Sequence, residues 1–169
     1  QYETLQAAVD AVQGSGTIEL TSSIALSDQV TIDSGKTIIL DMNGETLSIG
    51  FSDSSKNLIV NNGTLTITGD GTFDATEATS YKGFINNYGT LTVENGTFQI
   101  ADKAMTVHLR NQDGGKAVIN GGTFSGGATI VRSFEGSNTT ITGGSFTNSV
   151  YPAVDVNGET LITGGIFTN

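Results

Sequence analysis

Apolar and polar residues alternate over short segments of the chain, and a glycine-containing bend follows each segment. Residues 63–73 read Gly-Thr-Leu-Thr-Ile-Thr-Gly-Asp-Gly-Thr-Phe, and variants of this segment return at 89–98, 115–124, 138–146 and 159–167. Alternation with a period of two is typical of a strand that buries one face. Each copy is therefore expected to contain a short strand, a bend and the start of a second strand.

The copies end in phenylalanines that return at intervals of 21 to 26 residues, namely Phe73, Phe98, Phe124, Phe146 and Phe167. Helical repeats are excluded, because glycine and β-branched residues at this density destabilise a helix, glycine alone by about 1 kcal/mol relative to alanine. Strands that return at this interval favour a solenoid, in which successive coils pair as parallel strands about 4.8 Å apart. We therefore predict about seven coils with the phenylalanines stacked inside.

This register predicts two sheets with inward-facing rows. One predicted sheet buries Leu47, Leu65, Leu91, Ala117, Thr139 and Thr160 in one row, and Ile49, Ile67, Val93, Ile119, Ile141 and Ile162 in the next. The other predicted sheet buries Leu40 and Met42, Leu58 and Val60, Gly83 and Ile85, Val107 and Leu109, Val131 and Ser133, and Val154 and Val156. Asparagines recur at the end of this sheet, at 61–62, 86–87 and 111, where hydrogen bonds between coils would fix the register.

The two ends of the chain have different patterns. Leu5, Ala8, Val9 and Val12 share one face at helical spacing, so residues 1–14 are expected to form a capping helix. Such a cap covers the apolar lumen and the free strand edges of a first coil. Residues 15–169 are expected to form the coils of the same single domain. The pattern stops without a polar cap, and we expect either further chain or a partner to cover the last coil.

Composition excludes several classes of protein. The chain has 169 residues with 7 basic and 17 acidic side chains, a net charge of −10, which excludes nucleic acid as a partner because phosphates are bound by Lys and Arg. The absence of cysteine excludes disulfides and thiolate zinc sites, and a single histidine excludes sites that need two imidazoles. No apolar run is long enough to cross a membrane. Because the chain begins at Gln1 without a signal-type segment, we expect a processed form, or a fragment or module of a larger protein or assembly.

Three kinds of segment resemble those of one known superfamily. Leu5-Gln-Ala-Ala-Val-Asp-Ala-Val is similar to its capping helix, residues 36–47 resemble its early coils, and the Gly-Thr-Phe units resemble repeats of secreted Gram-positive bacterial proteins and phage particles. On these residues the chain resembles the pectate-lyase-like superfamily. The resemblance implies an all-β fold, a right-handed single-stranded parallel β-helix with a short N-terminal capping α-helix. It does not assign a function, because the superfamily includes lyases, hydrolases, phage tailspikes, adhesins and modules without chemistry.

One outward stripe of the predicted fold has an unusual composition. Its first row contains Asp41, Ile59, Phe84, His108, Arg132 and Asp155, and the row beside it contains Asn43, Asn61, Asn86, Arg110, Phe134 and Asn157. The candidate binding residues are Phe84, His108, Arg110, Arg132, Phe134 and Asp155. Aromatic faces stack on sugars and arginine makes bidentate bonds to carboxylates, so this stripe would suit a carbohydrate or another anionic ligand. The alternative is a solvated strand face on which Phe84 and Phe134 pack together.

A catalytic site, a metal site or a bound cofactor is not expected. The resemblance implies that a lyase would cluster acidic residues around Ca²⁺ beside a basic side chain, whereas only Asp113 and Asp155 lie near the arginines here. It also implies that a hydrolase would carry a Gly-His-Gly motif, whereas His108 lies in Thr-Val-His-Leu-Arg.

We therefore expect a non-enzymatic, extracellular structural or adhesive module of a bacterial surface protein that binds a carbohydrate or a protein partner. One alternative is a phage virion structural protein, such as a capsid decoration or fibre segment, associated as a homotrimer. A second alternative is a small polysaccharide lyase or hydrolase that acts through Arg110, Arg132, His108 and Asp155. The partners considered are further copies of the chain in a homotrimer or a following domain that contacts the C-terminal coil, whereas insertion into a membrane is not expected.

Overall fold

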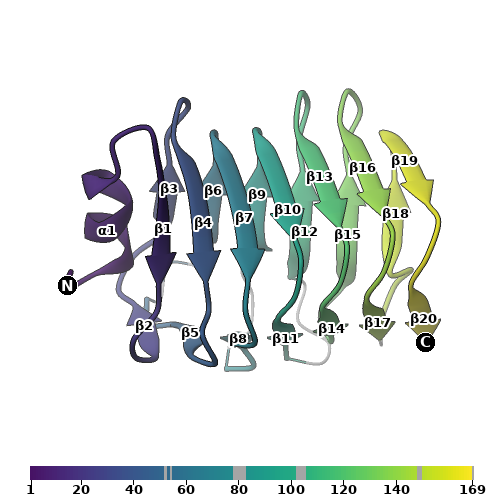
Figure 1. The fold of residues 1–169 in the computed structure, drawn as a ribbon. Helices are drawn as coiled ribbons and strands as arrows, with labels where there is room; N and C mark the ends of the chain where they lie inside the picture. The colour runs from purple at the N-terminus through teal and green to yellow at the C-terminus, as the bar shows by residue number, and fades with distance from the viewer. Residues whose placement is uncertain (52, 54, 78–82, 102–105, 148–149, 169) are drawn as a thin grey trace.

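The structure is a computed structural model that describes residues 1–169 except 52, 54, 78–82, 102–105, 148–149 and 169. One helix, α1 (Leu5–Ala11), precedes all the strands. The strands form three parallel sheets that run along one axis (Figure 1). In the part of the chain that is described, no helix has the length and apolar character needed to cross a membrane.

In the described residues, each of six turns contributes one strand to each sheet, and β19 and β20 add one more strand to the first and second sheets. The first sheet contains β1 (Ser15–Glu19), β4 (Thr37–Asp41), β7 (Thr64–Thr68), β10 (Thr90–Val93), β13 (Lys116–Ile119), β16 (Asn138–Ile141) and β19 (Glu159–Ile162). The second contains β2 (Ile24–Leu26), β5 (Thr46–Ile49), β8 (Thr72–Ala75), β11 (Thr97–Ile100), β14 (Thr123–Ser125), β17 (Ser145–Thr147) and β20 (Ile166–Thr168). The third contains β3 (Val30–Ile32), β6 (Asn57–Asn61), β9 (Gly83–Asn87), β12 (Val107–Asn111), β15 (Thr129–Ser133) and β18 (Val154–Val156).

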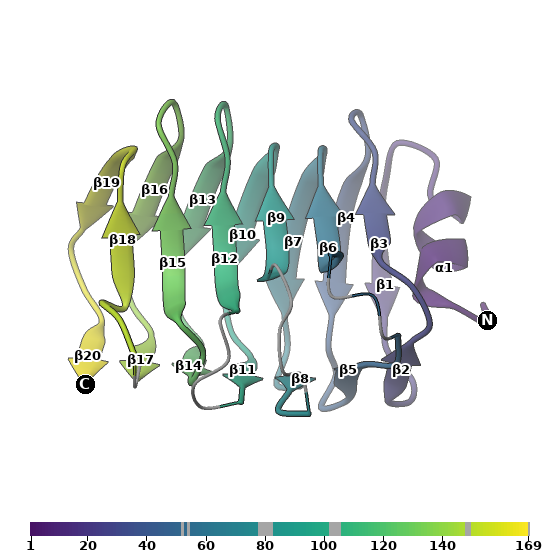
Figure 2. The ribbon, with the colours of Figure 1, turned by 180° about the vertical axis from the view of Figure 1, so that it is seen from behind.

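The predicted fold class is confirmed as a parallel β-solenoid with one short N-terminal helix. The three sheets make about six turns, against the about seven coils predicted from the repeats. In Figure 1 the first-sheet strands run downward at the front, and in Figure 2 the third-sheet strands run upward on the opposite side. An observer who looks along the axis from α1 towards β20 therefore sees the chain turn clockwise as it advances, which makes the solenoid right-handed.

The core is a set of columns that run along the solenoid axis. The predicted phenylalanine column is confirmed: successive ring centroids from Phe73 to Phe167 lie 4.6, 4.6, 5.1 and 4.7 Å apart, with interplanar angles of 10° or less. Stacking at these distances adds attraction beyond the burial of apolar area. The aliphatic rows from Leu65 and Ile67 through Ile141 also form in the predicted register.

The early coils were assigned to the wrong sheets. Leu47 pairs with Phe73 in the second sheet, and Leu40 pairs with Ile67 in the first. The reason is that Thr46-Leu-Ser-Ile alternates in the same way as a first-sheet strand, although Leu47 holds the place that phenylalanine takes in later coils. Alternation defines a strand but not the sheet to which it belongs.

Buried asparagines connect successive coils of the third sheet, as predicted. Asn61 Nδ2 donates to Asn87 Oδ1 at 2.7 Å, and Asn87 Nδ2 donates to Asn111 Oδ1 at 2.8 Å. The series continues from Asn111 Nδ2 to Thr139 Oγ1 at 2.9 Å. These bonds satisfy amides that would be costly to bury unpaired, so they specify the register of the coils.

Helix α1 covers the start of the solenoid, as predicted. Thr4 caps it by accepting a hydrogen bond from Ala7 N at 3.1 Å, and Leu5, Ala8 and Val9 are buried. The Gln6 side-chain amide bonds the backbone of Thr31 in the edge strand β3, accepting from N at 2.7 Å and donating to O at 3.1 Å. Lys36 Nζ donates to three carbonyl oxygens at the end of the helix, those of Val9, Asp10 and Val12.

Candidate functional site

The six candidate residues do not lie on one surface. Arg110, Arg132 and Asp155 face outward from β12, β15 and β18 of the third sheet, and Phe134 follows the end of β15. Phe84 and His108 lie in the interior. The predicted outward placement therefore holds for four of the six residues and fails for Phe84 and His108.

The outward row differs from the predicted row. Arg110 pairs with Asn86 on one side and with Arg132 on the other, and Arg132 pairs with Asp155. Asp41 belongs to the first sheet, and Ile59 is buried opposite Ile85. The predicted pair Leu58 and Val60 was therefore out of register by one residue, because Val60 pairs with Asn86 in the outward row.

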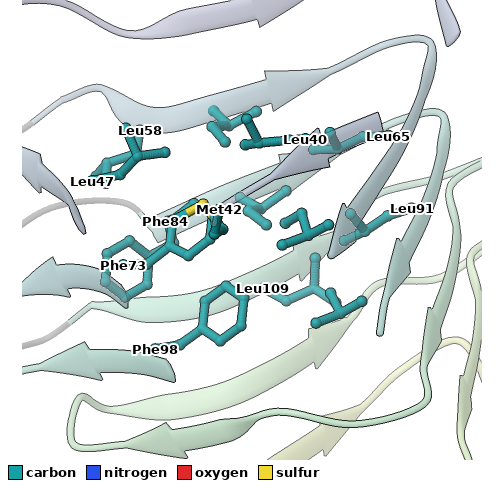
Figure 3. Close-up of a cluster of buried hydrophobic side chains, with 14 of the residues drawn as sticks. Leu40, Met42, Leu47, Leu58, Leu65, Phe73, Phe84, Leu91, Phe98 and Leu109 are labelled. Atoms are coloured by element: carbon teal, nitrogen blue, oxygen red, sulfur yellow. The ribbon is translucent and has the colours of Figure 1, made fainter. Parts of the chain in front are cut away.

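Phe84 is a core residue. Its side chain is 0% exposed, and its ring centroid lies 6.2 Å from that of Phe73 and 6.4 Å from that of Phe98. Figure 3 shows the ring of Phe84 among these labelled core side chains. The first three residues of β9 are all buried, so strict alternation fails where the strand leaves the corner with the second sheet. Phe84 cannot stack on a ligand at the surface.

His108 occupies the same kind of position on β12. It is 1% exposed, and its ring contacts those of Phe84 at 5.4 Å and Phe124 at 5.9 Å between centroids. Its Nε2 lies 3.2 Å from the carbonyl oxygen of Gly126. Burial lowers the pKa of His108 from 6.5 to about 4, which outweighs the opposite effect of its hydrogen bonds to the backbone of Gly126 and Ser125. The prediction that His108 lies on the outer surface is therefore wrong.

Arg110 and Phe134 do meet on the outer face. The Arg110 guanidinium carbon lies 5.1 Å from the centroid of the Phe134 ring, a cation–π contact. The pKa of Arg110 is lowered by burial and then by the positive charge of Arg132, while Tyr88 acts in the opposite direction. Among the described residues, Arg110 forms no salt bridge. Its guanidinium is thus held in place by an aromatic ring rather than by a carboxylate.

Arg132 and Asp155 form an ion pair between neighbouring strands. Arg132 Nε donates to Asp155 Oδ2 at 2.9 Å, and the two side chains are 33% and 40% exposed. This pair neutralises one of the two arginines and leaves the other without an acidic partner among the described residues.

Three polar residues of this face were missed as candidates from the sequence. Gln112 Nε2 donates to Asn86 Oδ1 at 2.5 Å, and Asn86 Nδ2 donates to Tyr88 Oη at 3.3 Å. Tyr88 is 48% exposed. The signal was the segment Asn86-Asn-Tyr88, in which a tyrosine lies two residues beyond an outward asparagine. We call the following set the outer strip: Asn86, Tyr88, Arg110, Gln112, Arg132, Phe134 and Asp155.

The outer strip combines guanidinium donors, amides and aromatic rings. This combination suits a ligand that has hydroxyl or carboxylate oxygens and an apolar face. Across the described residues no group of three or more His, Cys, Asp or Glu side chains is placed to hold a metal ion. The strip is therefore better described as a candidate binding surface than as a candidate metal centre.

Comparison of the chain with protein-family models, with curated proteins and with solved structures found no match. The structure shows the fold, which is a parallel β-solenoid with three sheets and one N-terminal helix in the described residues.

Proposed function

We propose that this chain is a non-enzymatic, extracellular structural module of a bacterial surface protein, and that its outer strip binds a carbohydrate. The observation that carries the proposal is the Arg110 guanidinium over the Phe134 ring, with the exposed Tyr88 nearby, where β9 and β15 of the third sheet end. The link to the pectate-lyase-like superfamily is part of the same proposal and rests on the sequence resemblance.

The geometry of the strip supports sugar binding in two ways. Tyr88 and Phe134 offer ring surface against which the apolar face of a pyranose can pack. Arg110 offers several N–H donors in one plane, and no described acidic side chain forms a salt bridge with it. Donors of this kind suit ring hydroxyls or a sugar carboxylate.

The state of the titratable groups supports binding rather than turnover. Asp155, the acidic residue of the strip, is engaged by Arg132 at 2.9 Å. His108 is enclosed in the core with a pKa of about 4. A general acid or base must reach the proton that it transfers, so neither group is placed as the predicted lyase or hydrolase would need.

The experiment is binding of the purified chain to a glycan array and then, for each hit, titration calorimetry. Tyr88→Ala and Arg110→Gln should each weaken binding to the same glycans by at least about tenfold, which is about 1.4 kcal/mol. Thr140→Ala, on the outer face of the first sheet, is the matched control and should bind like the wild type. Glycan binding that survives both strip substitutions would overturn the assignment of the surface.

Turnover is tested with the same ligands. Incubation of the wild type with neutral and acidic polysaccharides should release no new reducing ends and no unsaturated products. Release that disappears in Arg132→Ala would replace the binding proposal with the enzymatic alternative.

A second candidate function is favoured by the last turn of the solenoid. Val156, Leu161, Ile162, Ile166 and Phe167 are all more than 40% exposed, which is a large apolar end for a turn of this fold. We propose as the alternative a phage virion component in which further copies cover these side chains in a homotrimer. Sedimentation equilibrium that gives a trimer at micromolar concentration would favour the virion component, and a monomer would favour the surface module.

A further inference from the structure

His108 lies in a site that suits a neutral imidazole. The rings of Phe84 and Phe124 contact it at centroid distances of 5.4 and 5.9 Å, and only 1% of the residue is exposed. Neither neighbour can accept a hydrogen bond in the way that water does. A charged group in such a place loses hydration without a counter-charge to replace it.

The hydrogen bonds of His108 define which nitrogen carries the proton. Nε2 lies 3.2 Å from the carbonyl oxygen of Gly126, so Nε2 bears the hydrogen and donates it. Nδ1 is buried and has no hydrogen-bond partner among the described residues. Protonation would add an N–H donor at Nδ1, which has no described partner in the closed structure, and the backbone hydrogen bonds with Gly126 and Ser125 offset only part of the cost of burying the charge.

The charged groups around His108 do not compensate for a second positive charge. β9, β11 and β14, which pack against this region, carry no titratable side chain. β12 and β15 carry Arg110 and Arg132 on their outer face, and both are cationic. No Asp, Glu, Lys or Arg is among the buried residues that the structure describes.

The residue that His108 bonds lies at a corner of the solenoid. Gly126 and Gly127, between β14 and β15, both have φ of +76°, a conformation that favours glycine. The corner is joined to the preceding coil by Ala128 N, which donates to Thr106 O at 2.9 Å, and by Gly127 N, which donates to Ala101 O at 3.4 Å. The His108 side chain adds a third connection from the start of β12.

We propose that His108 is an acid-sensitive latch. In its neutral form it joins the 126–128 corner to β12. Protonation keeps the Nε2–H bond to Gly126 but places a charge and a second N–H donor in the apolar interior, so the protonated form favours an open corner in which water reaches the ring. This strand also carries Arg110, so the latch lies on the same element as part of the outer strip. The proposal does not depend on what the strip binds.

The direction of the pH dependence follows from proton linkage. Burial lowers the pKa of His108 to about 4 in the closed state, whereas the open state has the ordinary value of 6.5. The open state therefore binds the proton more readily, and opening becomes more favourable as the pH falls from about 7 to about 4. From pH 7, the equilibrium constant of opening should rise about 20-fold by pH 5 and approach a rise of about 240-fold well below pH 4.

The test is hydrogen exchange measured by mass spectrometry on the full chain at pH 7 and pH 5, after correction for the intrinsic exchange rates. In the wild type, peptides that cover 106–111 and 126–131 should lose protection by about 20-fold at pH 5 relative to pH 7. Peptides that cover β4 and β7 serve as the internal reference and should change much less.

Two variants remove the titrating group. His108→Phe introduces phenylalanine, the residue found at the equivalent position 84 of the preceding coil. His108→Gln keeps a side-chain N–H that can donate to Gly126. In both, the extra loss of protection at pH 5 should disappear. The proposal is overturned if the wild type keeps its protection at pH 5, if the folded variants lose protection as the wild type does, or if the loss is equal in all coils.

Discussion

The first and last turns of the solenoid have similar inward-facing residues but very different surroundings. At the first turn, Leu5, Ala8 and Val9 of α1 are buried against the core. At the last turn, Phe167 continues the phenylalanine column but is 42% exposed. Phe146, one coil earlier in the phenylalanine column, is 0% exposed. Burial in this fold is therefore set by the layer that covers a turn, and not by the turn itself.

The strand edges show the same contrast. At the N-terminal end, Gln6 bonds the backbone of Thr31 in β3 through both ends of its amide. At the other end, β18, β19 and β20 are the outermost described strands of their sheets. Uncovered edges invite pairing with other chains, and α1 with Gln6 protects the N-terminal edge against it.

The largest expected effect tests the difference in side-chain burial between the first and the last turn. Leu5→Ala should lower the free energy of unfolding by about 2–5 kcal/mol, because it leaves a cavity between α1 and the first coil. The matched change Ile162→Ala, at a residue that is 45% exposed in the last turn, should cost about 1 kcal/mol or less. Urea unfolding followed by circular dichroism measures both values. Equal costs at the two ends would mean that the last turn is covered in solution.

The next effect concerns the polar attachment of the helix. Lys36→Met should cost about 2 kcal/mol, because it removes charged hydrogen bonds from Nζ to the carbonyl oxygens of Val9, Asp10 and Val12. Lys116→Met is the control, since Lys116 is exposed on the first sheet, and should change the unfolding free energy by less than about 0.5 kcal/mol. The comparison is made by urea unfolding at low and high salt. A similar cost for both substitutions would contradict a special role for Lys36.

A smaller effect is expected from the edge protection by Gln6. Gln6→Ala should cost about 1 kcal/mol, the usual net value of such hydrogen bonds, and should raise the exchange rate of the Thr31 amide. Gln13→Ala, at an exposed position beyond the helix, provides the control. Exchange followed by NMR separates the two variants. If the Thr31 amide stays protected in Gln6→Ala, the helix covers the edge without help from this side chain.

The fold could be predicted largely from the repeats, because one residue column constrains all the others. Once Phe73, Phe98 and Phe124 are aligned, the parallel register of β8, β11 and β14 follows. The same alignment did not assign the correct sheet to the strand that precedes Phe73, the first phenylalanine of the column. Leu47 takes that place in the column, and nothing in its local alternation distinguishes a second-sheet strand from a first-sheet strand.

The candidate site could be predicted only in part. Arg132, Asp155 and Phe134 follow the simple rule that alternate residues of a strand face outward. Phe84 and His108 break this rule. Each is the second residue of its strand, and the first three residues of both strands are buried. The chain offered one clue, since positions 84, 108 and 130 form a row that is apolar except for His108. A lone histidine in an apolar row indicates a core position.

The smallest expected effect concerns the last turn again. The Arg132–Asp155 ion pair ties β18 to β15, much as Lys36 ties α1 to the first coil, but its two side chains are 33% and 40% exposed. Water and salt screen such a pair, so Asp155→Asn should cost only about 0–1 kcal/mol. A double-mutant cycle with Arg132→Gln should give a coupling energy in the same range that decreases further at high salt. A coupling above about 2 kcal/mol that resists salt would show that the pair is shielded from water in solution. It would also mean that a partner covers the C-terminal turn, and the contrast between the two ends would then belong to the isolated chain alone.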